Sequence, residues 1–231
     1  REAVVGDGKP RISGHIAYRA VLRREDVPAH LWSDDVLLWG GEKTHLVHYP
    51  LRRGELFNLV AVFHSNKYDE GWNTFGDTAE LTERFAQAVP QVRELLGKIE
   101  TWKMWVLCDR EPVKNWSDRR VTLLGDACHA MPPFQAQGAA MGIEDAIVLA
   151  KCLAAEGVSE ASLRKYEKLR KPRTSKVLAS ARANMGVFHR SNAWTQAATY
   201  GPMKMADRLF PAMVRARQDW IYAYDVRRIQ V

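Results

Sequence analysis

The 231-residue sequence lacks several features that would place it in familiar classes of protein. It has only three cysteines, Cys108, Cys128 and Cys152, and they form neither a Cys-x-x-Cys pair nor a Cys/His zinc pattern. We therefore expect reduced thiols, as in a cytoplasmic protein, and no metal site. No apolar run is long enough to cross a membrane and no signal peptide opens the chain, so we expect no membrane contact.

A dinucleotide-binding fingerprint, Gly-x-Gly-x-x-Gly, is also absent. The segment "GDGK" at 6–9 is too short, and no helical pattern follows it. A nucleotide cofactor bound by this chain would therefore need other residues, or a partner that supplies the fingerprint.

Acidic residues are fewer than basic ones, 27 against 34, which gives a net charge of +7. A nucleic-acid partner is one reading of this charge, but the basic residues are spread along the chain. The one local cluster, "LRKYEKLRKPR" at 163–173, has helical spacing and is read as a solvated helix face. We expect no nucleic-acid partner, and an attraction for small anionic substrates instead.

The pattern of apolar residues predicts an antiparallel sheet followed by helices. Alternating or apolar runs bounded by turn residues predict strands at 14–22, 35–40, 45–51, 56–63, 102–109 and 120–126. Helical spacing predicts helices at 77–97, 138–155, 159–186 and 204–222, the first of them broken at Pro90. This order predicts a mixed α+β and α/β fold, with a substrate-type sheet followed by the last strand and helix of an α/β layer.

The most informative stretch is "LLGDACHAMPPFQAQGAAMGIEDA" at 123–146. Asp126 ends a β-branched and Leu-rich run, at the edge of a sheet where ligands of α/β folds bind. Pro132 and Pro133 stiffen the loop and remove two backbone donors, so it should present carbonyls. Gly138 and Ala139 then begin a helix whose N–H groups nothing blocks, and such a helix start favours negative charge.

This stretch resembles the second flavin-binding motif of single-component, FAD-dependent aromatic-ring hydroxylases. The segments "YRAVL", "HLVHYPLRRGELFNLVAVF", "CDREPVKNW" and "WIYAYDV" extend the resemblance over the chain. They are similar to the branch that includes 3-hydroxybenzoate 6-hydroxylase, salicylate hydroxylase and 6-hydroxynicotinate 3-monooxygenase. The resemblance implies an incomplete Rossmann-like FAD-binding domain and hydroxylation of a small phenolic acid, with NAD(P)H and O₂, through a flavin C4a-hydroperoxide.

The resemblance also implies domains and partners. It implies a substrate-binding sheet domain at 1–118, the second part of the FAD-binding domain at 119–156, and a C-terminal helical segment at 157–231. Family members begin with the missing fingerprint, and Arg1 falls where their second motif ends. We therefore expect the C-terminal portion of a longer enzyme, completed by an N-terminal half or a second chain, with a homodimer as the alternative.

The resemblance also assigns roles to the residues of this sequence that match the motifs of the family. The resemblance assigns cofactor contacts to Gly125, Asp126, Pro132, Gln137, Gly138 and Ala139, and substrate contacts to Pro133 and Phe134. The last two stand where relatives carry polar residues, so the identity of the aromatic acid stays open. His129 is expected to hold the loop by hydrogen bonds, and Glu144 and Asp145 are expected to brace neighbouring loops.

A general base is needed because a phenol becomes electron-rich enough only when it is deprotonated. His45 and Tyr49 lie four residues apart on a predicted strand and therefore share one face. Members of the branch place a His and a Tyr at this spacing against the substrate, so we expect His45 as the base and Tyr49 beside it. The alternative is a surface strand histidine without a catalytic role. His48 should point to the other face.

Three other functions remain open from the sequence. For this chain taken alone, the missing fingerprint favours a non-catalytic folded module that does not bind FAD, whereas Asp126, the proline loop, Gly138, His45 and Tyr49 favour a hydroxylase for the parent protein. A 6-hydroxynicotinate-type hydroxylase and a flavin oxidoreductase acting on a non-aromatic substrate are the other two.

Overall fold

The computed structural model describes residues 1–68 and 74–231 and divides the chain into two compact units. The sheet unit comprises residues 12–107 and 186–198, and the helical unit comprises residues 1–11, 108–185 and 199–231. The α+β composition is as predicted. The functional ranges 1–118, 119–156 and 157–231 stay a prediction.

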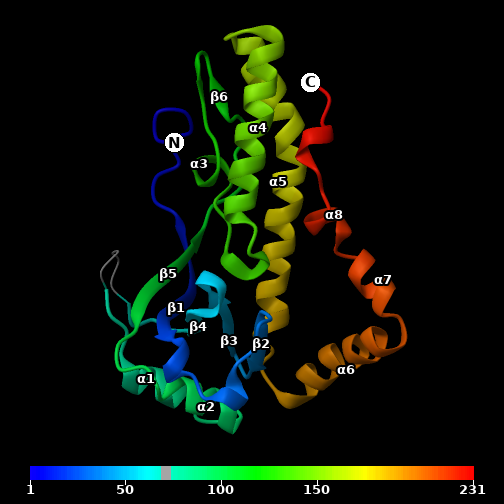
Figure 1. Ribbon diagram of the computed structural model, residues 1–231. Helices are drawn as coiled ribbons and strands as arrows, with labels where there is room; N and C mark the ends of the chain where they lie inside the picture. The colour runs from blue at the N-terminus through cyan, green and yellow to red at the C-terminus, as the bar shows by residue number, and fades with distance from the viewer. Residues whose placement is uncertain (69–73) are drawn as a thin grey trace. The chain divides into compact units, whose positions relative to one another are not determined.

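A five-stranded sheet forms the centre of the sheet unit (Figure 1). Its strand order is β2-β3-β4-β1-β5, with bounds β1 Arg11–Arg23, β2 Leu37–Gly41, β3 Thr44–Leu51, β4 Leu56–His64 and β5 Lys103–Asp109. The pairs β2–β3, β3–β4 and β1–β4 are antiparallel, which confirms the predicted antiparallel sheet. In this register, His45 lies opposite Val62, and Tyr49 lies opposite Asn58.

The two faces of this sheet differ in character. On one face, Tyr18, Phe57 and Phe63 are buried in a core that also contains apolar residues of the helices α1 Thr78–Arg84 and α2 Pro90–Leu96. The opposite face, called the site face below, carries alternate residues of β1, β3 and β4, because residues paired across antiparallel strands point the same way. Its members are Ala17, Arg19, Val21, His45, Val47, Tyr49, Asn58, Val60 and Val62.

Two features of the local sequence determine where the helices α1 and α2 begin. The Asp77 side chain accepts a hydrogen bond of 2.8 Å from the Ala79 amide, so it caps α1. Pro90 is the first residue of α2 and separates it from α1, as predicted. The turn between β3 and β4 is a short 3-10 segment at Arg52–Gly54.

The helical unit contains two long helices, α4 Gly138–Glu156 and α5 Glu160–Phe188, which form a hairpin (Figure 1). Before them lie the short strands β6 Ser117–Asp118 and β7 Val121–Thr122 and the helix α3 Asp126–His129. The predicted strand at 120–126, buried on both faces, is wrong. Only Val121–Thr122 is paired, with β6, and the side chains of Val121 and Leu124 are exposed, because the described residues provide no second neighbouring strand.

The C-terminal part also differs from the prediction of one helix at 204–222. It consists of α6 Ala193–Leu209, α7 Pro211–Ala216 and α8 Asp219–Tyr222. Pro211 ends the first of these and begins the second, because proline cannot donate the hydrogen bond that would continue a helix. Further 3-10 segments lie at Arg24–Asp26, Ala29–Leu31, Pro133–Gln135 and Val226–Arg228. Among the described helices, none has the length and apolar character needed to cross a membrane.

Gly76 gives a test of the packing in the sheet unit. A Cβ atom at this position would lie 2.3 Å from the Tyr18 ring. That ring is fully buried, and its hydroxyl accepts a 2.8 Å hydrogen bond from the Asp77 amide, so it has no room to move. We expect Gly76→Ala to lower the free energy of unfolding by about 1 to 3 kcal/mol in urea titrations, because the core would be overpacked.

The matched control is Gly186→Ala. A Cβ at Gly186, inside α5, would meet no atom within 4 Å. Alanine is also the better helix former, so this variant should be neutral or more stable by up to about 1 kcal/mol. Equal unfolding midpoints for the two variants would contradict the packing around Tyr18.

Candidate functional site

The Gly-Asp turn before α3 requires a glycine. Gly125 has φ of 59° and ψ of −138°, a conformation that residues with a side chain rarely adopt. Its amide donates a 3.0 Å hydrogen bond to Asp145 on α4, and a Cβ on Gly125 would lie 3.7 Å from the Cα of Gly142. The turn is therefore packed directly against the backbone of α4.

This packing brings Asp126 to the start of α4. The Asp126 side chain is exposed, and a Cβ built on Gly138 would lie 3.9 Å from its Oδ1 atom. Gln137, the residue before the helix, makes no side-chain capping bond, and Ala139 is exposed. A carboxylate that can accept hydrogen bonds thus lies beside an uncapped helix start that can donate them.

The proline loop between these elements is folded into a 3-10 turn. The Pro133 carbonyl accepts a 3.1 Å hydrogen bond from the Ala136 amide. The turn uses one lone pair of the Pro133 carbonyl, and the presentation of the proline carbonyls to a ligand stays a prediction. Pro132 is buried, Pro133 is exposed and Phe134 is buried.

Gln135 binds this loop to α5 through hydrogen bonds. This role was not predicted from the sequence. Its Oε1 atom accepts hydrogen bonds from Ser180 at 3.0 Å and from Asn184 at 2.6 Å, and its Nε2 atom donates to the Tyr222 hydroxyl at 3.2 Å. Asn184 also donates to the Phe134 carbonyl at 3.1 Å. Nothing in the sequence distinguishes Gln135 from Gln137, since its partners lie at least 45 residues away.

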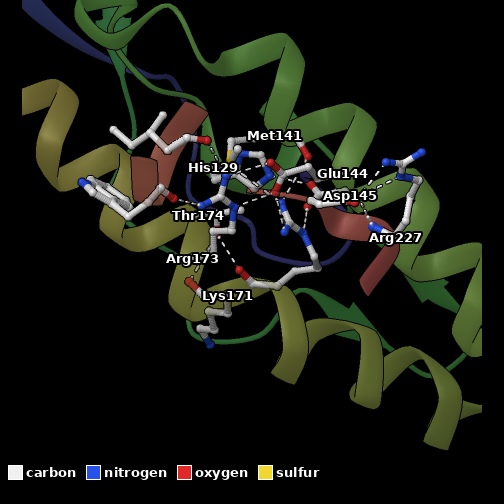
Figure 2. A network of polar contacts seen from close by, with 12 residues as sticks. His129, Met141, Glu144, Asp145, Lys171, Arg173, Thr174 and Arg227 are labelled. Carbon is white, nitrogen blue, oxygen red and sulfur yellow. Dashed lines mark hydrogen bonds and ion pairs between the residues drawn. The ribbon is translucent and has the colours of Figure 1, made fainter. Parts of the chain in front are cut away.

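Asp145 is the centre of a buried polar network (Figure 2). Besides the Gly125 amide, its carboxylate accepts hydrogen bonds from His129 Nε2 at 2.6 Å and from Arg170 Nε at 2.7 Å. Burial alone would raise the pKa of Asp145, but the bonds from His129 and Arg170 outweigh it and hold the pKa below its usual range. As expected, His129 holds the loop and Asp145 braces it.

Glu144 extends the network to the C-terminal segment. It binds Arg173 through two hydrogen bonds of 2.7 and 2.9 Å, and Arg173 also donates to the Trp220 carbonyl at 2.7 Å (Figure 2). The reading of 163–173 as a solvated helix face is therefore wrong for Arg170 and Arg173. Their face of α5 packs on α4, where the two adjacent carboxylates neutralise them.

Cys128, His129 and Asp145 have potential ligand atoms within 4.8 Å of one another. Burial raises the pKa of the Cys128 thiol, so the thiolate form that binds metals is disfavoured. The Arg170 guanidinium already supplies the positive charge beside Asp145. The geometry is that of a hydrogen-bonded brace rather than a metal site.

His45 is buried in a group of aromatic and imidazole rings within the sheet unit. Its Nδ1 atom lies 2.9 Å from Nε2 of His189, which follows α5, and the His189 ring stacks 4.5 Å from that of His15. Burial, followed by the nearby His189 and His15, lowers the pKa of His45 from 6.5 to about 3. The partner His189 was missed, because 144 residues separate the two.

Tyr49 lies on the site face with His45, as predicted, and is half-buried. Four residues of strand separate the two by roughly 13 Å, so they can contact opposite ends of a ligand but not the same atom. His48 points to the core face, where it is fully buried and accepts a 2.7 Å hydrogen bond from Trp39. It is structural, as expected.

Comparison with known proteins places the chain in a family. The profile of the family described as "FAD binding domain" matches residues 19–181, well over half of the chain. The chain belongs to this family. It is 44% identical over 190 residues to "3-hydroxybenzoate 6-hydroxylase 1" of Aquipseudomonas alcaligenes, covering 82% of this chain and 48% of that protein.

Two further matches, one curated relative and one solved structure, cover a larger share of this member of the FAD binding domain family. The 3-hydroxybenzoate 6-hydroxylase of Polaromonas naphthalenivorans is 35% identical over 235 residues, covering 98% of this chain and 56% of that protein. A solved "Salicylate hydroxylase substrate complex" superposes with a TM-score of 0.77 at 28% identity, covering 95% of this chain and 56% of that one. The chain is thus related to FAD-dependent aromatic hydroxylases, and spans about half the length of the curated relatives it matches.

The residues of the Gly-Asp turn fit part of an FAD molecule. FAD carries hydroxyl groups on its ribityl and ribose parts, and the exposed Asp126 carboxylate can accept hydrogen bonds from them. The reduced flavin ring carries negative charge, which the uncapped start of α4 would stabilise. Small side chains at Gly138 and Ala139 permit close approach.

The Asp145 network can be tested by removing one charge. Asp145→Asn would remove one of the two carboxylates, Asp145 and Glu144, that pair with the fully buried Arg170. We expect a loss of about 3 to 5 kcal/mol in the free energy of unfolding, measured by urea titration. Glu160→Gln removes only an exposed ion pair with Arg164, and should cost less than about 1 kcal/mol. A similar cost for the two variants would contradict the network.

The burial of His45 predicts a dependence of stability on pH. Below its ordinary pKa of 6.5, the unfolded chain takes up a proton that the folded state, with a pKa of about 3, does not. Stability should therefore be highest above pH 6.5 and fall as the pH decreases towards 3, by at most about 1.4 kcal/mol per pH unit from this residue. Urea midpoints measured from pH 7.5 to 5 should show a shallower fall for His45→Gln. An unchanged slope would contradict the buried, neutral imidazole.

Proposed function

We propose that this chain contributes the substrate-binding sheet and the second flavin-binding motif of an FAD-dependent monooxygenase that hydroxylates a phenolic aromatic acid with NAD(P)H and O₂. The observation that carries the proposal is the exposed Asp126 carboxylate beside the uncapped start of α4. The similarity to 3-hydroxybenzoate 6-hydroxylases supports the substrate class.

The cofactor contacts follow from the donors and acceptors of the turn. As the family resemblance implies, Asp126 would accept hydrogen bonds from the ribityl or ribose hydroxyls, and the amides of Gly138 and Ala139 would donate to the pyrimidine edge of the flavin. Gly125 provides the turn, and Pro132 and Gln137 border the ring. When bound, FAD supplies the transfer of electrons from NAD(P)H and of an oxygen atom from O₂.

His45 is the proposed base towards the substrate hydroxyl. Its low pKa keeps it neutral at pH 7, which is the form that accepts a proton. In the tautomer whose Nδ1–H donates to His189, Nε2 is the accepting atom. A base with this pKa holds a proton weakly, and the phenolate formed beside it stabilises the resulting imidazolium.

Tyr49, Pro133 and Phe134 are the proposed contacts to the rest of the substrate. Tyr49 offers a hydroxyl at the far end of the site face from His45. Pro133, which is exposed, and Phe134, which is buried, are kept as substrate contacts from the family resemblance.

The test uses the protein expressed from its complete gene. It should purify with flavin absorbance, and NADH oxidation should be stimulated by 3-hydroxybenzoate or salicylate with formation of a hydroxylated product. Asp126→Ala should weaken FAD binding. His45→Asn should keep FAD and lower kcat by about 10² to 10⁴ because it removes the base.

His30→Gln is the matched control for His45→Asn. His30 is an exposed histidine paired with Glu94, so its loss should leave kcat unchanged. A protein that binds no flavin would support the non-catalytic module instead. Flavin binding without stimulation by any phenolic acid would exclude the proposed substrate class, and an unchanged kcat in His45→Asn would exclude the base.

A further inference from the structure

A cavity of about 640 Å³ lies within the sheet unit, and the site described above does not use it. Its floor is formed by Arg19 and Val21 of β1, Asn58 of β4 and Trp105 of β5. Its wall includes Phe75, whose backbone forms a β-bridge with Lys103 at the start of β5. The cavity is therefore built from paired strands rather than from a loose loop.

Positive charge predominates around this cavity. Among the lining residues that the structure describes, Arg19, Lys98 and Lys103 are basic and Glu100 is the one acidic residue. Within residues 1–68 and 74–231, no carboxylate forms an ion pair with any of these three cations. They can therefore bind an anion without first breaking an existing pair, and Arg19 can hold a carboxylate through two hydrogen bonds.

The other residues that line the cavity favour a ligand with a flat, apolar part. The Arg19 guanidinium lies 5.4 Å from the centre of the Trp105 ring, so charge and aromatic surface are adjacent. Phe75 and Val21 are 60% and 51% exposed, which leaves apolar area uncovered at the cavity. An aromatic ring would cover this area while its charged group faces the cations.

We infer that this cavity is a second binding site, specific for small aromatic carboxylates and distinct from the contact with His45. The site face connects the two: Asn58, which lines the cavity, pairs with Tyr49, whereas His45 pairs with Val62 four residues along β4. An acid bound in the cavity lies beside the Tyr49 end of the site face. Binding there requires neither flavin nor a ring hydroxyl, so it is separable from the proposed hydroxylation.

Benzoate is the probe, because it has the ring and the carboxylate but no hydroxyl group. Equilibrium dialysis of labelled benzoate against the flavin-free 231-residue chain at low salt should show one saturable site. Arg19→Gln and Lys103→Gln should each weaken binding about tenfold, since each removes a charge-assisted contact. Arg23→Gln, an exposed arginine of β1 outside the cavity, should change it less than about twofold.

Ligand and site controls complete the test. Benzyl alcohol, which lacks the charge, and acetate, which lacks the ring, should both bind more weakly than benzoate. Folded His45→Asn should bind benzoate as the unchanged chain does. The inference is overturned by an absence of saturable binding, by equal affinity in the Arg19→Gln and Lys103→Gln variants, by equal affinity for benzyl alcohol, or by loss of binding in His45→Asn alone.

Discussion

The buried carboxylate of Asp145 is the interaction on which the helical unit depends. It holds the Gly125 amide, His129 and Arg170 at once, and so joins the Gly-Asp turn, the loop after it, α4 and α5. A buried carboxylate is costly unless it is neutralised and hydrogen-bonded, and here both conditions are met. Asp126, in the turn that Asp145 holds, is exposed and lies beside the start of α4.

The two faces of the sheet place their histidines in different surroundings. The core face is filled by Tyr18, Phe57 and Phe63 and by two helices, and it also contains His48. The site face carries His45, whose burial against His189 keeps it neutral. The alternation of side chains along β3 thus gives two histidines, three residues apart, opposite surroundings and different roles.

The sequence predicted the positions of helices and strands better than it predicted which distant residues contact one another. Five strands, the helix break at Pro90 and the two long helices follow from patterns within each segment, and the structure confirms them. The strand at 120–126 failed because strand length depends on neighbouring strands, which local pattern does not reveal. The shared face of His45 and Tyr49 could be read from spacing, whereas Gln135, Arg170 and His189 depend on contacts between distant segments. The bracing role of Asp145 was predicted, but its buried cationic partner Arg170 on α5 was not.

The central claim is that the braced turn presents Asp126 and the first amides of α4 to a flavin. Amide hydrogen exchange of Gly138 and Ala139, measured on the protein from its complete gene with and without FAD, tests this most directly. The account predicts marked slowing of both amides when FAD is bound, with little change at Val148, a fully buried residue of the same helix. Unchanged exchange at Gly138 and Ala139 in a protein whose absorbance shows bound flavin would contradict it.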